Sequence, residues 1–278
     1  MGESSNSVLA AEQSTPSLVA EKTALRGTLV VNADDWGRDG ETTDRMFDCI
    51  KCRTVSAVSA MVFMEDSQRA ASMARDFGID AGLHLNLSAP LTAGNCPVSL
   101  AEHHGKVMRY LQRHALARIF YNPMLARSFE YVVKAQLEEF RRLYAVDAQR
   151  IDGHHHLHLC ANVQRKRLLP EGTLARRNFS FQAGEKSWFN RTYRARVDQR
   201  LARRHRVMDY LFLLPPLEAS RLQRIFSLAR HSAVEVETHP VNPAEHKFLT
   251  GGEMLRVAGD IAIAERFPGG RRLNPPNS

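Results

Sequence analysis

Apolar and polar positions follow two alternating patterns along most of the chain. Runs that suit β-strands occupy residues 28–31, 55–63, 79–87, 149–152, 178–181, 207–214 and 233–238. Helix-like spacing, with apolar residues every three or four positions, falls near residues 46–50, 70–77, 125–144 and the 190s. The run from Leu125 to Tyr144 is the longest of these and predicts an amphipathic helix. Strands that alternate with helices indicate an α/β protein with a parallel sheet.

Both ends of the chain lack this alternation. Residues 1–25 are rich in Ser, Ala and Glu and show neither the basic nor the apolar segment of a secretory signal. We predict a disordered leader over residues 1–25, a single domain over 26–267 and an irregular tail over 268–278. No run approaches the roughly 18 apolar residues of a membrane span. A cytoplasmic protein without a membrane span is therefore expected.

The composition fits one domain with a sizeable core, since 44% of the 278 residues are hydrophobic. The formal charge of +8 reflects 38 basic residues against 30 acidic ones, an excess too modest to predict nucleic-acid binding. Seven arginines between Arg191 and Arg206 form the one conspicuous basic run. Because few aromatic residues interleave with them, we interpret the run as a solvated helix face and expect no nucleic-acid partner.

Carboxylates and imidazoles gather where the predicted strands end. Asp34 and Asp35 follow the first strand, His84 lies in the third, and His239 follows the last. Four histidines and an aspartate also crowd into residues 152–158, directly after the fourth strand. Because the carboxyl ends of parallel strands meet at one edge, these side chains should lie close together. Carboxylates and imidazoles are typical ligands of divalent metals, so this edge predicts a metal site.

Each motif also has a plain structural interpretation. Asp34 and Asp35 could cap a helix and form a turn, since Asp is favoured at both positions. His84 could be a hydrogen-bonded core residue, and His239 could simply leave its strand before a turn. The cluster at 152–158 could be a solvated loop. The shared position of all the motifs at strand ends favours a joint functional site.

Four motifs occur in the order of a known family. They are Asn32-Ala-Asp-Asp-Trp-Gly37, Gly82-Leu-His-Leu-Asn-Leu87, Asp152-Gly-His-His-His-Leu-His158 and Thr238-His-Pro240. As a set they resemble the YdjC/ChbG-type carbohydrate deacetylases. The resemblance implies a TIM-barrel-like (β/α) barrel, regular or irregular, akin to the polysaccharide deacetylases. It also implies a metal-dependent hydrolase that removes acetyl groups from N-acetylated sugars, with a small acetylated sugar as substrate. A homo-oligomer is compatible with the resemblance.

The resemblance assigns roles residue by residue. It implies that Asp35, His84 and His154 hold one divalent ion, Mg²⁺ or Zn²⁺. It implies Asp34 as the general base and His239 as the acid that protonates the leaving amine. Asp34 and Asp35 are adjacent, so both can reach one pocket only where the strand bends. The alternatives are a metal-dependent phosphoesterase or amidohydrolase on the same barrel, and a non-catalytic metal or carbohydrate binder.

The residues themselves leave the ligand within the histidine cluster open. His154, His156 and His158 would share one face of an extended segment, so any of them could bind the ion. Another could then hold a ligand in place by a hydrogen bond, and Asp152 is expected to orient one of these histidines. Only the resemblance selects His154.

Overall fold

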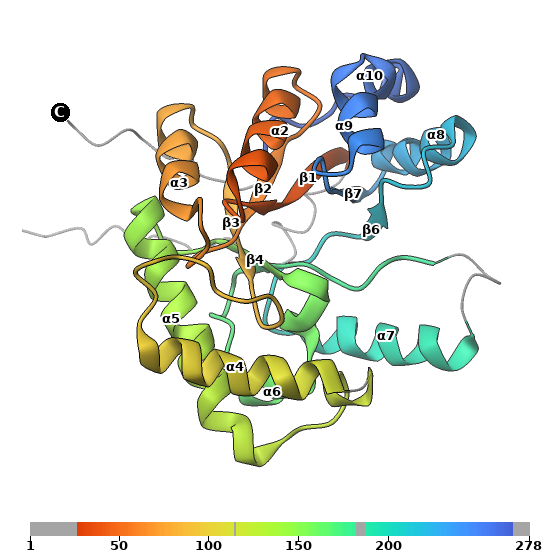
Figure 1. Ribbon diagram of the computed structural model, residues 1–278. Coiled ribbons are helices and arrows are strands. Elements are labelled where there is room, and N and C mark those ends of the chain that lie inside the picture. Colours follow the sequence, from red (N-terminus) through yellow and green to blue (C-terminus); the bar gives the residue numbers. More distant parts are fainter. Residues whose placement is uncertain (1–26, 114, 182–186, 269–278) are drawn as a thin grey trace, which may run out of the picture.

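The computed structural model describes residues 27–113, 115–181 and 187–268 (Figure 1). The predicted leader over residues 1–25, and all but the first residue of the predicted tail, lie outside them. Seven parallel strands form one sheet in the order β5-β4-β3-β2-β1-β7-β6. They are β1 (Thr28–Trp36), β2 (Ala57–Ala60), β3 (Ala81–Leu85), β4 (Arg150–Gly153), β5 (Leu174–Ala175), β6 (Tyr210–Leu213) and β7 (Ala233–Thr238). The predicted α/β class and parallel sheet are confirmed.

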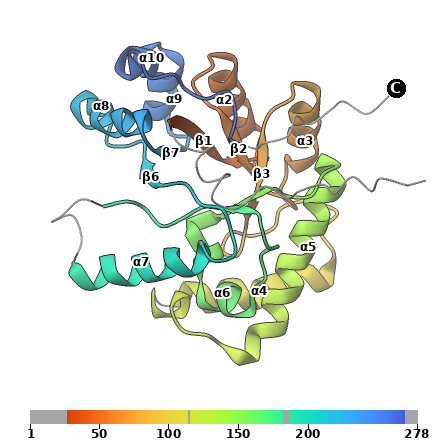
Figure 2. The same cartoon turned by 180° about the vertical axis from the view of Figure 1, so that it is seen from behind.

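The sheet curls into a half-barrel with helices around it (Figure 1, Figure 2). Its edge strands approach each other through a parallel bridge between Leu174 of β5 and Arg206, which precedes β6. Because β5 is only two residues long, the sheet is thin on this side. The predicted TIM-barrel-like architecture is confirmed in this curled and irregular form.

Helices pack in two groups around the sheet. The α-helices are α2 (Gly40–Lys51), α3 (Ser67–Asp76), α4 (Val98–Arg113), α5 (Ala126–Tyr144), α6 (Ala161–Lys166), α7 (Trp188–Leu201), α8 (Ala219–Ser227), α9 (Pro243–Thr250) and α10 (Glu253–Ala258). Short 3-10 helices are η1 (Ala115–Arg118), η2 (Pro123–Leu125), η3 (His154–Leu159) and η4 (Leu228–Arg230). Helices α8, α9 and α10 gather beside β7 and α2, whereas α4, α5 and α6 gather beside β3 and β4 (Figure 1, Figure 2). Within the described residues, no helix is long and apolar enough to cross a membrane.

Helix α5 confirms the prediction from its apolar spacing. It begins at Ala126, one residue after the predicted start, and ends at Tyr144. Phe129, Val132 and Phe140 are fully buried on one face of the helix. Each large apolar side chain buried in this way stabilises the fold by about 1.5–3 kcal/mol. The helix therefore anchors the β3–β4 side of the sheet, from which part of the site is built.

Strand β1 extends beyond its predicted end at Val31. It continues through Asn32 and Asp34 to Trp36, although Asn and Asp are depleted in strands. These polar residues are tolerated because they are partnered: Asn32 Nδ2 lies 2.7 Å from both Ser59 Oγ and Asp34 Oδ1. Because the Nδ2 group of the buried Asn32 is hydrogen-bonded in this way, the strand can continue to the candidate site.

The predicted strand at residues 178–181 is wrong, and the fifth strand is Leu174–Ala175 instead. Residues 178–181 run beside β6 without forming a regular ladder. The backbone N–H of Ser180 donates to the carbonyl of Leu211, but the N–H of Leu211 donates to the side-chain hydroxyl of Ser180. The serine side chain thus takes the place of one backbone acceptor, and this competition ends the strand pairing.

Candidate active site

The carboxyl end of β1 contains a β-bulge at Asp35. Asp34 and Trp36 pair with successive residues of β2, so Asp35 is an extra residue in the strand. Its φ of 77° lies in the left-handed region, which is costly for a residue with a side chain and is often retained at functional sites. Because of the bulge, both carboxylates approach the His84 ring, at 3.9 Å for Asp34 and 3.3 Å for Asp35. The predicted bend is therefore present.

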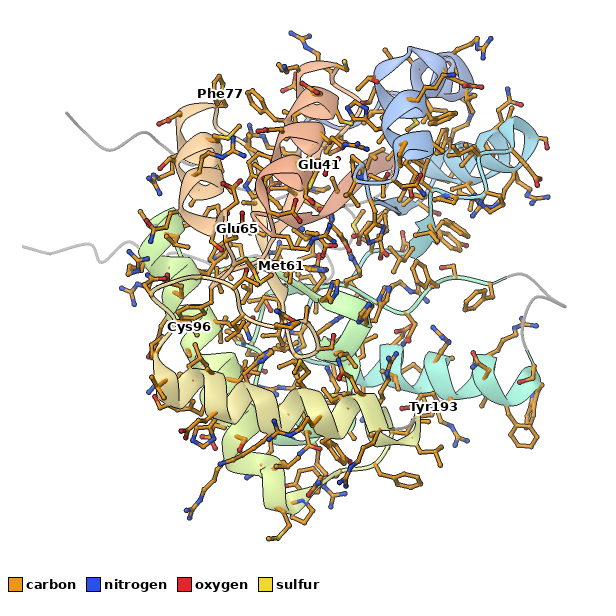
Figure 3. All side chains as sticks on the ribbon, in the orientation of Figure 1. Glu41, Met61, Glu65, Phe77, Cys96 and Tyr193 are labelled. Carbon is orange, nitrogen blue, oxygen red and sulfur yellow. The ribbon has the colours of Figure 1, made fainter. Side chains whose placement is uncertain are left out.

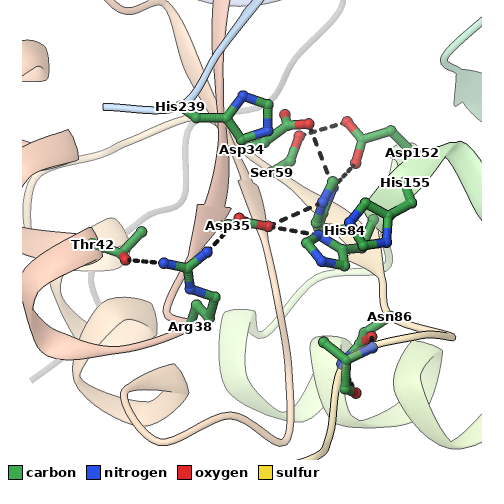
Figure 4. Close-up of polar contacts among 12 residues, drawn as sticks. Asp34, Asp35, Arg38, Thr42, Ser59, His84, Asn86, Asp152, His155 and His239 are labelled. Atoms are coloured by element: carbon green, nitrogen blue, oxygen red, sulfur yellow. Dashed lines mark hydrogen bonds and ion pairs between the residues drawn. The ribbon is translucent and has the colours of Figure 1, made fainter. Parts of the chain in front are cut away.

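Three predicted site residues converge at this edge of the sheet. His84 Nε2 lies 3.3 Å, and His154 Nδ1 3.0 Å, from Asp35 Oδ1. One donor atom from each lies within 4.8 Å of the others. Arg38 holds the other oxygen, Asp35 Oδ2, at 2.9 Å, so that Asp35 lies between Arg38 and His84 (Figure 4). Burial alone would raise the pKa of Asp35, but the adjacent imidazoles of His154 and His84 outweigh it and hold the pKa well below its usual range.

A second carboxylate orients His84. Its Nδ1 lies 2.7 Å from Asp152 Oδ1, and both side chains are buried. With the proton on Nδ1, the lone pair of Nε2 points toward Asp35. The expectation that Asp152 orients a histidine of its own cluster is wrong. Strands β3 and β4 pair with His84 directly opposite Asp152, so the sheet register selects His84 as the partner.

This arrangement fits a divalent ion. One carboxylate oxygen and two imidazole nitrogens form the donor set and leave positions for substrate and water. Among the described residues, Nε2 of buried His84 has no hydrogen-bond partner, which is costly unless something else binds it. Burial lowers the pKa of His84, but Asp34, Asp152 and Asp35 outweigh it and raise the pKa to about 10. A position that attracts a proton so strongly also attracts a cation.

A buried arginine holds the neighbouring aspartate. Arg176 follows β5, and its guanidinium binds the two oxygens of Asp34 at 2.5 and 2.8 Å. The same group lies 2.7 Å from Glu235 and 3.1 Å from both Asp152 and Glu237. Four carboxylates therefore surround one buried cation. Burial raises the pKa of Asp34 on its own, but the charge of Arg176 outweighs it and lowers the pKa.

The end of β7 brings Glu237 and His239 to the same pocket. Asp34, Glu237 and His239 each offer an atom within 4.8 Å of the others. His239 Nε2 lies 3.9 Å from Glu237 Oε1, and the His239 side chain is 33% exposed, so it remains accessible to a substrate. Burial and the negative charge of Asp34 raise the pKa of Glu237 to about 7, with Arg176 opposing them. The first and last strands thus supply the predicted base and acid to one place.

The histidine cluster is not extended, which corrects the expectation of a shared face. Residues 154–159 form η3, in which His155 and His156 adopt left-handed backbone angles with φ of 56°. His154 reaches Asp35, while the other rings have different partners. His155 Nδ1 lies 3.0 Å from Ser88 Oγ, His156 Nε2 lies 3.3 Å from Glu237, and His158 Nε2 lies 2.8 Å from the Arg176 carbonyl oxygen. Burial lowers the pKa values of His156 and His158 to about 3, so both rings are neutral near pH 7.

Comparison with known families identifies the family of the chain. The family model described as YdjC-like protein matches residues 28–262. The chain belongs to the YdjC-like family. The resemblance drawn from the sequence motifs is thereby confirmed.

Curated relatives of this YdjC-like chain cover part of it. It is 30% identical over 144 residues to a carbohydrate deacetylase of Mus musculus, a match that covers 50% of the chain and 45% of the relative. It is also 30% identical over 132 residues to a chitooligosaccharide deacetylase of Serratia marcescens, covering 47% of the chain and 50% of the relative. The chain thus spans about half the length of the curated relatives that it matches.

A solved structure shares the fold of the YdjC-like chain. It is a protein of Enterococcus faecalis V583 for which cleavage of cellobiose-phosphate has been proposed. The two superpose with a TM-score of 0.60 at 14% identity, covering 86% of this chain and 96% of the other. At this identity the likeness shows the half-barrel fold alone.

Three residues of the YdjC-like site escaped the sequence analysis, namely Arg38, Arg176 and Glu237. Arg176 lies at a strand end like the other candidates, but placing the fifth strand at 178–181 concealed its position. Glu237 alternates with Glu235 inside an otherwise apolar strand. That alternation was a usable signal, because a carboxylate is almost never fully buried without a partner.

Proposed function

We propose that this YdjC-like protein is a metal-dependent hydrolase that removes acetyl groups from N-acetylated sugars or oligosaccharides. Two groups of side chains meet at one sheet edge, and their adjacency carries the proposal. They are a ligand cluster, formed by Asp35, His84 and His154, and a proton-transfer cluster, formed by Asp34, Glu237 and His239. The names of the curated deacetylases support the substrate class. The predicted cytoplasmic location stays a prediction.

The ligand cluster would hold one divalent ion, Mg²⁺ or Zn²⁺. Imidazole nitrogens favour Zn²⁺ by intrinsic affinity, whereas the carboxylate suits either ion. When bound, such an ion polarises the amide carbonyl and lowers the pKa of water, in favourable cases from 15.7 to about 7. Asp152 keeps His84 in the tautomer that presents Nε2, and Arg38 keeps Asp35 in place.

Asp34 is the proposed general base, which accepts a proton from the attacking water. Its ion pair with Arg176 keeps it deprotonated and fixes both of its oxygens. Among the described residues Oδ1 accepts from both Arg176 and Asn32, whereas Oδ2 accepts from Arg176 alone and keeps a lone pair for water. Glu237 is the competing candidate, because its pKa of about 7 lies near the range in which a general base works best.

His239 is the proposed general acid, which donates a proton to the leaving sugar amine. It follows β7, so it lies beside the carboxylates and remains partly exposed. Glu237, 3.9 Å away, can orient the imidazole toward an incoming substrate. Water attacks the carbonyl, its proton passes to the base, and the C–N bond breaks as the amine is protonated.

Acetate release from N-acetylated glucosamine oligomers tests the reaction with metal-depleted protein reloaded with Mg²⁺ or Zn²⁺. Asp34→Asn keeps the size of the side chain but removes the base, so it should retain metal and lower turnover by about 10²–10⁴-fold. Glu237→Gln is the matched comparison and should lose less activity than Asp34→Asn. If Glu237→Gln loses the activity while Asp34→Asn stays within a few-fold of wild type, the base is Glu237.

His239→Ala separates acid catalysis from other roles. Amide substrates need a protonated leaving group, whereas esters need it less, so turnover of the amide should fall further than turnover of an acetyl ester. Equal losses on both substrates would assign His239 to oxyanion stabilisation instead. Turnover of a phosphomonoester without acetate release would favour the phosphoesterase alternative, and metal binding without either activity would favour a binding protein.

A further inference from the structure

Helix α7 projects from the molecule with little packing against the rest of the fold (Figure 1, Figure 2). Of its 14 residues, Leu201 alone is buried. The helix begins with two large aromatic side chains, Trp188 and Phe189, which are 68% and 78% exposed. Tyr193 lies one turn after Phe189 on the same helix face and is 43% exposed. Trp188 and Phe189 play no part in the core or in the candidate active site.

A neighbouring segment adds more exposed apolar surface. Residues 116–124 carry Leu116, Ile119, Phe120 and Met124, which are 53%, 43%, 62% and 88% exposed. Ile119 and Phe120 line a cavity of about 810 Å³ together with Tyr193, so the segment and α7 are neighbours. Across the described residues, seven of the eleven exposed large apolar side chains lie on these two segments. We call them together the α7 face.

The α7 face is also strongly basic. Five arginines line the cavity between its two segments, against one acidic residue, Glu171. Arg204 lies 3.4 Å from Glu171, whereas Arg200 and Arg203 have no carboxylate within 4.0 Å among the described residues. Uncompensated arginines beside exposed aromatic rings are the composition of a surface that binds anionic lipid headgroups and inserts apolar side chains between them.

We propose that the α7 face docks this protein on the surface of an anionic lipid bilayer. The positive charge complements such a membrane, while Trp188 and Phe189 suit the interface between headgroups and acyl chains. A second copy of this chain would present the same positive charge and be repelled. Nucleic acid would use the arginines and the rings, but it offers little to exposed aliphatic side chains such as Met124 and Ile119.

The docked orientation would also bring the candidate active site close to the bilayer. Ile119 and Tyr193 line a second, smaller cavity of about 280 Å³ together with His155 and His156 of the histidine cluster. Acetylated sugars displayed on lipids would therefore lie within reach of the catalytic residues. Vesicle binding requires no turnover, so it can be measured whether or not the proposed hydrolysis is correct.

Co-sedimentation with lipid vesicles tests the docking. The vesicles are phosphatidylcholine with roughly 30% phosphatidylglycerol, which makes their surface anionic. Wild-type protein should bind these vesicles, bind pure phosphatidylcholine weakly, and lose affinity as salt rises. Trp188→Ser with Phe189→Ser should weaken binding by roughly tenfold or more. Phe77→Ser is the matched control, because Phe77 is 64% exposed on the opposite side of the molecule from Tyr193 and should not alter binding (Figure 3).

Charge reversal tests the electrostatic part. Arg200→Glu with Arg203→Glu should abolish measurable vesicle binding, whereas Arg256→Glu, far from α7 on α10, should change it little. Thermal unfolding and circular dichroism of each variant confirm that it is folded. Equal effects of the Phe77 and Trp188/Phe189 changes would overturn the proposal. So would tighter binding of single-stranded RNA than of vesicles, or a dimer that the Trp188/Phe189 change dissociates.

Discussion

The ligand cluster and the proton-transfer cluster lie side by side at one sheet edge. They differ in whether the chain itself supplies a partner for their polar groups. In the ligand cluster, Nε2 of His84 has no hydrogen-bond partner among the described residues, so the cluster is open to an outside cation. In the proton-transfer cluster, Arg176 already binds Asp34 and Glu237, so the chain closes the cluster itself. Asp34 and Asp35 are adjacent, and the bulge directs each toward a different cluster.

This difference separates metal affinity from stability. The open cluster leaves the buried Nε2 of His84 without a hydrogen-bond partner among the described residues, which favours binding of an ion. The closed cluster has already brought its carboxylates and their cation out of water, and removing one partner leaves the others buried and uncompensated. Removing the arginine of the closed cluster should therefore act mainly on unfolding, and substitutions in the open cluster mainly on metal binding.

Replacing Arg176 by Met should give the largest effect. Four buried carboxylates lose their shared cation, and breaking a buried ion pair costs about 3–5 kcal/mol. Urea denaturation should report a fall of that size in the unfolding free energy. Arg256→Met is the control, because that side chain is 76% exposed and its ion pair should contribute less than about 1 kcal/mol. A comparably small loss for Arg176→Met would show that the closed cluster contributes little to stability.

Alanine at Asp35, His84 or His154 should chiefly change metal binding. Each removes one of three donors, and affinity should fall by roughly hundredfold or more, beyond the loss typical of changes that only affect a ligand's orientation. Elemental analysis of chelator-washed and reloaded protein measures the bound metal. His155→Ala, whose ring contacts Ser88, should keep normal stoichiometry. Unchanged metal content in all three ligand variants would exclude this set.

Asp152→Asn should have a smaller effect of the same kind. The amide keeps a contact with His84 but no longer holds its Nδ1 proton as a carboxylate does. Metal affinity should fall by about 10–100-fold, as expected when an orienting partner is weakened rather than a ligand lost. Competition with a metal-sensitive dye gives the affinity. A wild-type value would show that the sheet pairing alone orients His84.

The smallest expected effect is a pH dependence at His158. Burial lowers its pKa from 6.5 to about 3, so the folded state binds the proton less tightly than the unfolded state. Above pH 6.5 His158 is neutral in both states and does not lower the unfolding free energy. As the pH falls below 6.5, the unfolded state takes up the proton first, and the unfolding free energy decreases by at most about 1.4 kcal/mol per pH unit. His158→Gln keeps an N–H donor for the Arg176 carbonyl. From pH 6.5 to 5, the unfolding free energy of the wild type, measured by urea denaturation, should fall by about 1–2 kcal/mol more than that of the variant. Parallel plots of unfolding free energy against pH would refute this.

Elements with a strong local pattern could be predicted from the sequence. β7 has its predicted bounds, Ala233–Thr238, because a β-rich run ends there in a turn. Helix α4 was missed although Leu100, His104, Val107 and Leu111 are buried at helical spacing. A buried histidine in the middle of that stripe counts as polar in a sequence pattern, so it interrupted the apolar periodicity. Burial of polar residues likewise concealed the true end of β1.

In the candidate site, too, residues beside a strong local pattern could be predicted and the others could not. Asp35, His84 and His154 could be proposed because each lies beside a recognisable strand, and parallel strands share one carboxyl edge. Arg176 could not, since it meets Asp34 across 142 residues and lies next to a two-residue strand. The His84–Asp152 pair likewise depends on sheet register, which no local pattern specifies. Long-range ion pairs are a property of the assembled sheet.

The position of β1 between β2 and β7 has a consequence for biosynthesis. Of the strands that the structure describes, β1 is synthesised first, but one of its edges pairs over six residues with β7, which is synthesised last. At roughly 5–20 residues per second, translation would take on the order of 10–40 s to reach Ala233–Thr238. Throughout that time an apolar segment has an unpaired edge, which favours association with other chains. The nascent polypeptide is therefore exposed to aggregation at least until β7 has been made.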